Sequence, residues 1–481
     1  MCPKAMFPRI APLRSASKFM LFILLASILF VAPDISSALD KPLIINPDGA
    51  WTWWQDKRAL ICENNLTVGS SSHDGNVQVT NWDFKTGSIE TKILHISFPP
   101  DDHNAPGILL RKDGHLMAFY SKHNQEALMY YRVTTRAGDP SDWQPEQTYS
   151  AGVKDYFTYA NPFQLSAENG RIYNFWRGID FNPTWSASDD EGKTWSKGAN
   201  HIYFKKGERP YVKYASNDMD TIHFAFTETH PNRMNTSLYH AYYKAGSIFT
   251  SNGKFVRNLS KGPIQPFEAT RVYNGTRTPT GRAWCWDMAL DSNCYPIVVY
   301  STHPSPMDIR YRYARWDGNQ WIDYQIAFAG KCLYDGEPFF AGGICLDPDN
   351  PDTVYLSSNV NITTGKSNGS GHYEIYRGER GMQGKSWIWQ AITSTSTQDN
   401  LRPIVPAHHP GKTFVLWFRG KYESYTDYET EIVAYSDGRI PALPKSLHAI
   451  NTRSNTFSWL SSSVLDRVAS AWQRIFLDKL E

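Results

Sequence analysis

The chain has 481 residues, a formal net charge of +2 and an aromatic content of 14%. A chain of this length and aromatic content can bury a large hydrophobic core. Because its charges are nearly balanced, the composition gives no reason to expect nucleic acid as a partner, which would require a strongly basic surface.

The first segment has the pattern of a secretory signal peptide, which we assign to residues 1–38. Basic residues between positions 4 and 18 precede the apolar run 19–31, and Ser36-Ser37-Ala38 offers a cleavage site. An uncleaved membrane anchor is the alternative, but the run is shorter than the roughly 20 residues that a spanning helix needs. We therefore expect a secreted or periplasmic protein with no stable membrane span after cleavage.

Two histidines flank one predicted hairpin at its open end. Two apolar runs flank an Asp-Gly turn at residues 113–114, which is a strong hairpin signal. His103 lies about ten residues before the turn and His123 about ten residues after it. Positions equidistant from a turn lie side by side in antiparallel strands. The two imidazole rings should therefore meet, beside the carboxylates of Asp101 and Asp102.

The same arrangement recurs in the next two units along the chain. Tyr159 precedes and Arg177 follows a hairpin with an Asn-Gly turn. In the third unit, Arg209 and Tyr211 precede the turn and His230 follows the return strand. Three successive units thus bring histidine, tyrosine and arginine to matching ends, which indicates a shared site on one face of a repeat protein.

The hairpin pattern as a whole predicts an all-β fold, a seven-bladed β-propeller over residues 45–440. The units start near Ala59, Gly107, Pro162, Arg209, Trp286, Phe340 and Pro403. Their spacing of about 50 to 75 residues suits four-stranded blades better than a solenoid, with six or eight blades as alternatives. Residues 188–195 have the Asp-box pattern, a structural turn typical of propeller hairpins. Residues 441–481 are predicted to form a linker and a C-terminal amphipathic helix.

The cysteines leave the disulfide connectivity open. Five remain after cleavage: Cys62, Cys285, Cys294, Cys332 and Cys345. An odd number leaves at least one unpaired, and the pairs 285–294 and 332–345 could each staple a hairpin. The sequence has no CxxC pair and no HExxH motif, so no catalytic zinc is predicted. A structural metal ion stays open, and His240 is either a core residue or a ligand of such an ion.

The chain resembles the secreted BNR-repeat propeller family that includes bacterial ulvan lyases. The resemblance covers roughly residues 45–440, and its matching stretches are 101–106, 120–123, 159–162, 175–178, 237–243, 371–378 and 417–422. In the lyases, two histidines at about this spacing, a tyrosine and an arginine line the central cleft. The resemblance therefore implies that His103, His123, Tyr159 and Arg177 are catalytic. For the tyrosine, Tyr156 and Tyr173 are alternatives.

These residue types suit β-elimination from a uronate. An arginine can neutralise the sugar carboxylate as enolate charge develops, because its charge is permanent and its fork binds carboxylates in bidentate fashion. A base must remove the C5 proton and an acid must protonate the leaving oxygen, roles that His103, His123 and Tyr159 can divide. A tyrosine base would need a lowered pKa, which Arg177 and a histidinium could supply. Asn104, Arg209, Tyr211 and His230 are candidates for substrate binding.

Three classes of function compete. The first is a polysaccharide lyase with an acidic polysaccharide as its partner, acting as a monomer and needing no cofactor. The second is a glycoside hydrolase of sialidase or rhamnosidase type. A sialidase would have an arginine triad, a tyrosine with a carboxylate partner and usually several Asp boxes, of which one is clear here. The third is a non-catalytic glycan-binding propeller.

Overall fold

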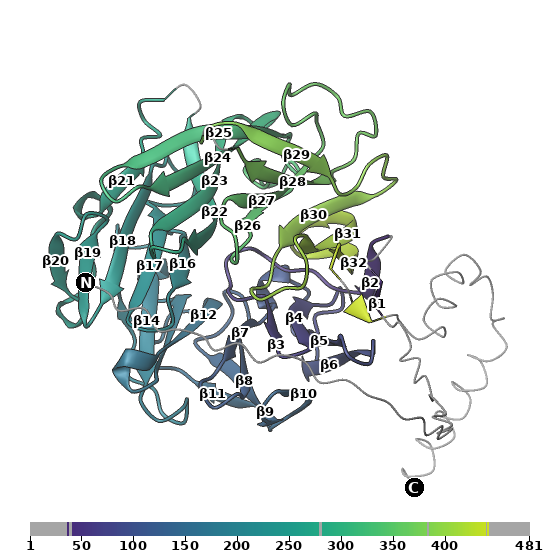
Figure 1. Ribbon diagram of the computed structural model, residues 1–481. Helices are drawn as coiled ribbons and strands as arrows, with labels where there is room; N and C mark the ends of the chain where they lie inside the picture. The colour runs from purple at the N-terminus through teal and green to yellow at the C-terminus, as the bar shows by residue number, and fades with distance from the viewer. Residues whose placement is uncertain (1–35, 38–40, 279–280, 382–383, 439, 442–481) are drawn as a thin grey trace, which may run out of the picture. The chain divides into compact units, whose positions relative to one another are not determined.

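The computed structural model describes residues 36–37, 41–278, 281–381, 384–438 and 440–441. Seven antiparallel sheets follow one another around a ring, which confirms the predicted seven-bladed β-propeller (Figure 1). The described residues form no α-helix, and none of their helices has the length and apolar character needed to cross a bilayer. Apart from Ser36–Ser37, the predicted signal peptide lies outside the described residues, as does the predicted C-terminal helix.

The strands follow the chain blade by blade. The first blade contains β3 (Ala59–Cys62), β4 (Asn65–Ser71), β5 (Val77–Asp83) and β6 (Ile89–His95). The second contains β7 (Gly107–Leu110), β8 (Leu116–Tyr120), β9 (Met129–Arg136), β10 (Asp139–Trp143) and β11 (Gln147–Tyr149). The third contains β12 (Thr158–Leu165), β13 (Arg171–Arg177), β14 (Pro183–Ser188) and β15 (Ala199–Asn200).

The remaining four blades complete the ring. The fourth contains β16 (Val212–Ser216), β17 (Thr221–Thr227), β18 (Leu238–Lys244), β19 (Ser247–Thr250), β20 (Phe255–Asn258) and β21 (Thr270–Tyr273). The fifth contains β22 (Arg282–Leu290), β23 (Pro296–Ser305), β24 (Asp308–Trp316) and β25 (Trp321–Gly330). The sixth contains β26 (Ile344–Leu346), β27 (Thr353–Ser358), β28 (Glu374–Arg380) and β29 (Trp387–Ala391). The seventh contains β30 (Asp399–Ile404), β31 (Phe414–Ser424), β32 (Asp427–Ser436) and β2 (Leu43–Asn46).

The strand β2 closes the ring, because it comes from the start of the described propeller and pairs with β32 at its end. Leu43 lies opposite Ala434 in this antiparallel pair. A second, shorter pair joins β1 (Ser36–Ser37) to β33 (Ile440–Pro441). The five 3-10 helices lie between strands: η1 (Asp102–Asn104), η2 (Ser166–Glu168), η3 (Ile179–Phe181), η4 (Leu259–Lys261) and η5 (Pro266–Glu268).

The core lies between neighbouring blades, which pack face to face. For this reason the middle strands are buried on both faces: all five residues of β8 and all seven of β17 are buried. Between the third and fourth blades, Phe163 and Phe175 pack against Tyr214. Packing of this kind requires apolar residues at consecutive positions, not only at alternate ones. This explains the aromatic and β-branched runs of the sequence.

The predicted Asp box forms the turn between β14 and β15. The Asp190 carboxylate accepts hydrogen bonds from the Ser188 hydroxyl at 2.8 Å and from the Thr194 backbone N–H at 2.8 Å. The Trp195 indole N–H donates to the Gly192 carbonyl at 3.1 Å. Because each of these groups is used within the turn, the motif is structural.

A segment between β2 and β3 fills the middle of the ring. We call residues 51–58 the central segment. Its Trp53 stacks on Trp286 of the fifth blade, with ring centroids 3.9 Å apart, and donates its indole N–H to the Cys285 carbonyl. Trp51 donates to the carbonyl of Arg402 in the seventh blade. Lys213 of the fourth blade donates to the Trp53 carbonyl at 2.6 Å. The central segment is thus tied to blades on several sides of the ring.

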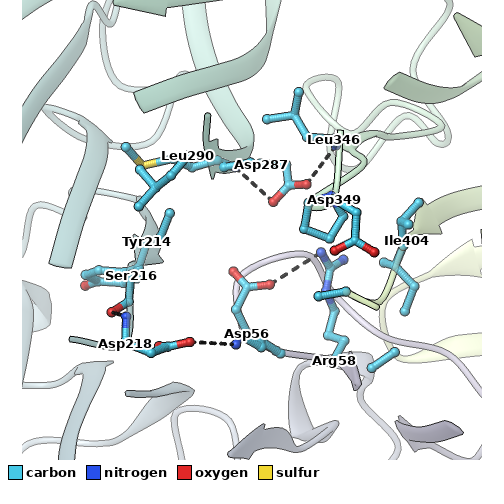
Figure 2. Close-up of a pocket in the computed structure, with 18 of the residues that line it drawn as sticks. Asp56, Arg58, Tyr214, Ser216, Asp218, Asp287, Leu290, Leu346, Asp349 and Ile404 are labelled. Carbon is cyan, nitrogen blue, oxygen red and sulfur yellow. Dashed lines mark hydrogen bonds and ion pairs between the residues drawn. The ribbon is translucent and has the colours of Figure 1, made fainter. Parts of the chain in front are cut away.

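Because of the central segment, the two ends of the ring differ. A cavity of about 300 Å³ lies at the end where the first strands of the blades finish, lined by Ser216, Leu290 and Ile404 among others (Figure 2). Asp56 and Arg58 of the central segment form its floor, with a 3.5 Å ion pair between them. The predicted site residues lie at the other end, where the first strands begin.

The cysteines of the propeller form no disulfides. All five, Cys62, Cys285, Cys294, Cys332 and Cys345, are free thiols. The two hairpin staples that the sequence allowed are therefore wrong. Cys285 and Cys345 are buried in the core, and burial raises the pKa of the Cys285 thiol to about 12. These thiols behave as small apolar side chains.

Candidate active site

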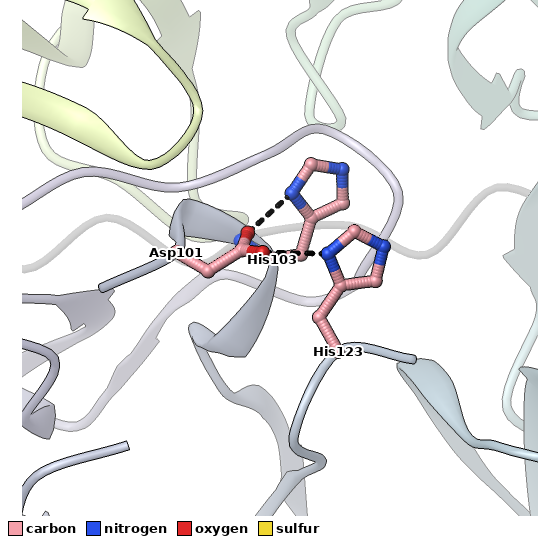
Figure 3. Close-up of side chains that lie close together, drawn as sticks. All are labelled: Asp101, His103 and His123. Atoms are coloured by element: carbon pink, nitrogen blue, oxygen red, sulfur yellow. Dashed lines mark hydrogen bonds and ion pairs between the residues drawn. The ribbon is translucent and has the colours of Figure 1, made fainter. Parts of the chain in front are cut away.

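Two histidines meet at the open end of the β7–β8 hairpin, as the turn position predicts. Gly107 pairs with Phe119, and the same register continued outward brings His103 opposite His123. His103 lies in η1 and His123 lies just beyond β8. The two rings are stacked, with centroids 4.1 Å apart and an interplanar angle of 11° (Figure 3).

One carboxylate holds both rings. The Asp101 carboxylate accepts from Nδ1 of His103 at 2.7 Å through Oδ1 and from Nδ1 of His123 at 2.6 Å through Oδ2 (Figure 3). Nε2 of His123 faces the amide nitrogen of Asn124 at 2.9 Å and Nη2 of Arg177 at 3.3 Å. Both of these neighbours are donors, so Nε2 of His123 accepts and the ring is neutral, with its proton on Nδ1.

The pKa values of the two histidines move in opposite directions. Burial alone would lower the pKa of His103, but the charges of Asp101 and Asp102 outweigh it and raise that pKa to about 9. For His123, burial and the neighbouring His103 charge lower the pKa to about 4. Near neutral pH the pair therefore consists of one imidazolium and one neutral imidazole.

A buried ion pair supports the charge on His103. Asp102 Oδ1 lies 2.8 Å from Nδ1 of His103. The other oxygen of Asp102 accepts from Arg402 at 2.5 Å and from the Tyr422 hydroxyl at 2.7 Å. Asp102 and Arg402 are both fully buried. Although burial would raise the pKa of Asp102, the charge of Arg402 keeps it below its ordinary value, so a carboxylate stands next to His103.

Tyr159 and Arg177 come from the next blade and lie against the histidines. The β12–β13 pairing shifts register between Thr158 and Asn161, and Tyr159 sits in this bulge with a φ of 70°. Such a backbone conformation is strained for a tyrosine and is typical of functional positions. It turns the Tyr159 ring to within 5.7 Å of the His103 ring centroid and brings the hydroxyl to 3.5 Å from Nη1 of Arg177.

The alternative tyrosines lie elsewhere. Tyr156 is exposed, and the hydroxyl of Tyr173 is hydrogen-bonded to Glu168 of η2 and to Tyr243 of the fourth blade. The lowered pKa that a tyrosine base would need is not found at Tyr159. Burial outweighs the charge of Arg177 and raises the pKa of Tyr159 well above 10, so the hydroxyl keeps its proton. The structure brings this tyrosine to the histidines as a neutral donor, not as a phenolate.

Arg177 is buried without a carboxylate partner. Its Nη1 contacts the Tyr211 hydroxyl at 3.2 Å, and its Nη2 donates to the Asn124 amide oxygen at 3.1 Å. Among the described residues no carboxylate lies within 4.0 Å of it, and its Nε is buried without a hydrogen-bond partner. A buried guanidinium that has no counter-ion in the protein is suited to hold an anionic ligand.

The residues of the third unit extend this site. The Tyr211 ring lies 5.5 Å from the His230 ring, and Nε2 of His230 lies 3.5 Å from a carboxylate oxygen of Glu337. Arg209 stacks over the ring of Phe181. Asn104 differs from the others. Its amide groups bond the Pro99 carbonyl and the His123 backbone N–H, so it braces the histidine loop.

Sequence reasoning missed three residues of this site. Asn124 accepts a hydrogen bond from Arg177 and so helps to position it. Its place directly after His123 in the chain is the only feature of the sequence that points to it. The Tyr425 ring lies 5.0 Å from the His103 ring and comes from the β31–β32 turn of the seventh blade. Glu337 comes from the loop between β25 and β26. No local pattern marks either loop residue.

Several clusters offer metal-ligating atoms. Asp101, His103 and His123 have ligand atoms within 4.8 Å of one another, but each Nδ1 is already bonded to Asp101. Two other groups lie away from the site: Asp48, His73 and Asp74, and Asp347, Asp349 and His409. His240 is buried and pairs with His223, with its Nε2 3.1 Å from Nδ1 of His223.

Comparison with known proteins gives the same architecture. Residues 52–329 match the sequence profile described as a BNR repeat-containing family member. No curated protein sequence matches the chain. Among solved structures, an ulvan lyase bound to -[GlcA(1-4)Rha3S]- is similar with a TM-score of 0.64 and 13% identity, covering 85% of this chain and 99% of that chain. A sialidase of a Hadza microbe has a TM-score of 0.39 and 11% identity, covering 66% of this chain and 65% of that one.

Proposed function

This chain belongs to the BNR repeat-containing family, and we propose that it is a secreted lyase that cleaves an acidic, uronate-containing polysaccharide of the ulvan kind by β-elimination. The observation that carries the proposal is Arg177. It is buried, has no carboxylate partner among the described residues, and contacts both a neutral histidine and a neutral tyrosine. A lyase needs this combination of clamp, base and acid around one sugar.

The substrate carboxylate takes the position beside Arg177. As the base removes the C5 proton, negative charge moves into the carboxylate and produces an enolate-like group. The guanidinium fork, and the imidazolium of His103 nearby, stabilise that charge more than they stabilise the ground state. The electrons of the C5–H bond then form the C4–C5 double bond, and the C4–O bond breaks. The leaving oxygen takes a proton from the acid.

The pKa directions support a division of roles. His123 is neutral above pH 4 and accepts through Nε2, next to Arg177, so it is suited to be the base. Tyr159 keeps its proton and is suited to protonate the leaving oxygen. His103 stays charged up to about pH 9 and adds positive potential. Tyr211, which contacts Arg177 and the His230 ring, and His230 are suited to bind the neighbouring sugar, and Arg209 is a further candidate.

The hydrolase alternative has less support. A sialidase-type tyrosine nucleophile needs a carboxylate that takes its proton. Among the described residues the Tyr159 hydroxyl contacts Arg177, and no carboxylate is hydrogen-bonded to it. A glycan-binding propeller does not require a buried guanidinium beside one charged and one neutral histidine. Both alternatives remain as outcomes of the test below.

The test is the product of the reaction. Ulvan and other uronate polysaccharides are incubated with the purified protein, and ultraviolet absorbance and mass spectrometry are used to look for an unsaturated uronate at the new non-reducing end. Saturated reducing sugars would replace the proposal by a hydrolase. Binding without any reaction would replace it by a lectin-like role. We further propose that turnover needs no metal, so prior treatment with EDTA should leave the rate unchanged.

A further inference from the structure

The cavity of about 300 Å³ at the end of the ring opposite the candidate active site, which we call the far cavity, is lined by a buried arginine whose donors are unused. Arg58 is 6% exposed and lies 3.5 Å from a carboxylate oxygen of Asp56. Within the part of the chain that the structure describes, its side chain makes no hydrogen bond, and its Nε is fully enclosed. A buried guanidinium is costly unless something accepts from it. Its donors therefore indicate a ligand in the far cavity.

Three carboxylates face the same space. Asp56, Asp287 and Asp349 line the far cavity together with Arg58, and the four side chains turn toward one another (Figure 2). Asp287 stands in a bulge of β22 and has no ion-pair partner within 4.0 Å among the described residues. Its two oxygens each accept one backbone N–H at 2.9 Å, which leaves lone pairs for a ligand. Burial raises the pKa of Asp287, and the charges of Lys213 and Arg58 offset this only in part.

The charges around the far cavity do not favour an anion. At its rim, Lys57 pairs with Asp218 at 3.5 Å, and both side chains are more than half exposed. On its floor, Lys213 donates a hydrogen bond to the carboxylate of Asp56. The lining groups that remain are one guanidinium, two carboxylates and one exposed imidazole, from Arg58, Asp287, Asp349 and His408. One guanidinium against two carboxylates gives an anionic ligand no net attraction.

The carboxylates do not come together as ligands of one metal ion. Among the described residues, Asp56 and Asp287 belong to no group of three ligating atoms within 4.8 Å of one another. Asp349 belongs to such a group with Asp347 and His409, but one of its oxygens already accepts two backbone N–H groups, at 2.6 and 3.2 Å. The polar groups are therefore spread around the wall of the far cavity, as a ligand with several separate polar groups requires.

Apolar side chains form the wall between these charges. Leu290, Leu346 and Ile404 line the far cavity from the fifth, sixth and seventh blades. Phe163 and Tyr214 line it from the third and fourth blades and bring aromatic rings to it. Binding sites for small molecules combine apolar walls with a few placed polar groups, and a volume of about 300 Å³ lies at the lower end of their range. The far cavity therefore suits one small ring that has polar groups at its edge and apolar faces.

We propose that the far cavity is a second, lectin-like site that binds one neutral sugar ring. A sugar hydroxyl both donates and accepts, so one ligand can accept from Arg58 and donate to Asp287 and Asp349. The C–H faces of the ring pack against the apolar wall and its aromatic rings. This site does not depend on the lyase proposal. It would hold a neutral sugar at one end of the ring while the candidate active site, at the other end, holds an acidic chain.

The experiment measures sugar binding to the purified protein by isothermal titration calorimetry. The neutral probes are rhamnose, xylose, glucose and galactose, and the charged analogues of glucose are glucuronate and glucosamine. Arg58→Met removes the donors at similar size, and Leu290→Phe narrows the cavity without changing a charge. Arg377→Met is the control, because Arg377 is 8% exposed but paired with Glu379 outside the far cavity. Arg177→Ala separates this site from the candidate active site, and thermal unfolding checks the fold of each variant.

At least one neutral sugar should bind the wild type, and Arg58→Met should weaken that binding about tenfold, the loss expected for a hydrogen bond to a charged group. Leu290→Phe should abolish binding, whereas Arg377→Met and Arg177→Ala should keep it. The neutral-sugar site is overturned if none of the four neutral sugars binds, if Leu290→Phe binds normally, or if Arg377→Met loses as much as Arg58→Met. Tighter binding of glucuronate or glucosamine to the Arg177→Ala protein overturns it as well. Should Arg58→Met not fold, Leu290→Phe and the charged analogues decide the question.

Discussion

His103 and His123 lie face to face, 4.1 Å apart between ring centroids, and share the carboxylate of Asp101, yet their pKa values move apart to about 9 and about 4. Two stacked rings cannot both be charged without strong repulsion. The second carboxylate, Asp102, contacts His103 but not His123, and its charge favours the proton on His103. The asymmetry of the pair therefore originates in Asp102 and in Arg402 behind it.

The pH dependence of turnover follows from this pair. Turnover should increase as pH rises through about 4, where His123 loses its proton, and should decrease as pH rises through about 9, where His103 loses its charge. The free energy of unfolding should also decrease at alkaline pH, because His103 loses its charge there. Its raised pKa contributes stability that is complete below about 6.5 and lost as pH rises through about 9. A kcat profile together with thermal unfolding across this range checks both, and a flat profile contradicts the assignment.

Replacement of Asp101 should remove the link between the two rings. In Asp101→Asn the largest favourable charge on His103 is lost, so the pKa of His103 should decrease and the alkaline limb of the profile should move toward neutral pH. NMR titration of the imidazole protons measures the shift directly. Asp113→Asn is a suitable control, because that carboxylate lies at the opposite end of the same hairpin and pairs with Arg111. An unchanged alkaline limb contradicts the role of Asp101.

Removal of Arg177 should lower turnover by about 10² to 10³, the size expected when a charge-stabilising donor is removed. The same variant should bind substrate less well, since the guanidinium also contacts the ground-state carboxylate. Arg177→Lys keeps the charge but loses the fork and should recover only part of the rate. Arg171→Ala, six residues earlier on the same strand and paired with exposed Asp189, serves as control. Near-full activity in Arg177→Ala would falsify the carboxylate clamp.

Much of the fold is encoded locally, and this is why it could be predicted. The Asp-Gly turn at 113–114 fixes the register of one hairpin, and that register alone sets His103 opposite His123. The same reasoning applies to Arg177, which lies opposite Thr158 at the end of its hairpin. Each blade begins with a hairpin whose turn is visible in the sequence. The predicted starts of the seven hairpin units therefore fall near the first strand of each blade.

Contacts between distant segments could not be predicted in this way. The central segment is rich in tryptophan, which is also typical of a β-strand. Nothing in its local sequence shows that it fills the middle of the ring instead. Tyr425 and Glu337 reach the site from loops more distant in sequence. The sequence shows that Arg177 is near Tyr159 and could lower its pKa, but it does not show that the ring is fully buried, and burial raises the pKa instead. The catalytic roles of these residues stay predictions.

The central segment should determine the stability of the whole propeller. Trp53 is buried against Trp284 and Trp286 of the fifth blade and Phe340 of the loop before the sixth, and its indole N–H bonds the Cys285 carbonyl. Trp53→Ala should lower the free energy of unfolding by about 3 to 5 kcal/mol. The substitution leaves a cavity in the middle of the ring, and the surrounding blades cannot move inward to fill it.

The control for this prediction is Trp389→Ala in β29, the outermost strand of the sixth blade, where the tryptophan is only partly buried. Thermal and denaturant unfolding should show a much larger loss for Trp53→Ala than for Trp389→Ala. Because Trp54 of the same segment packs on Tyr211, with ring centroids 4.6 Å apart, a shift of the central segment should also reach the site. Trp53→Ala should therefore lose turnover at temperatures well below its unfolding midpoint. Equal stabilities of the two variants would show that the blades, and not the central segment, hold the ring together.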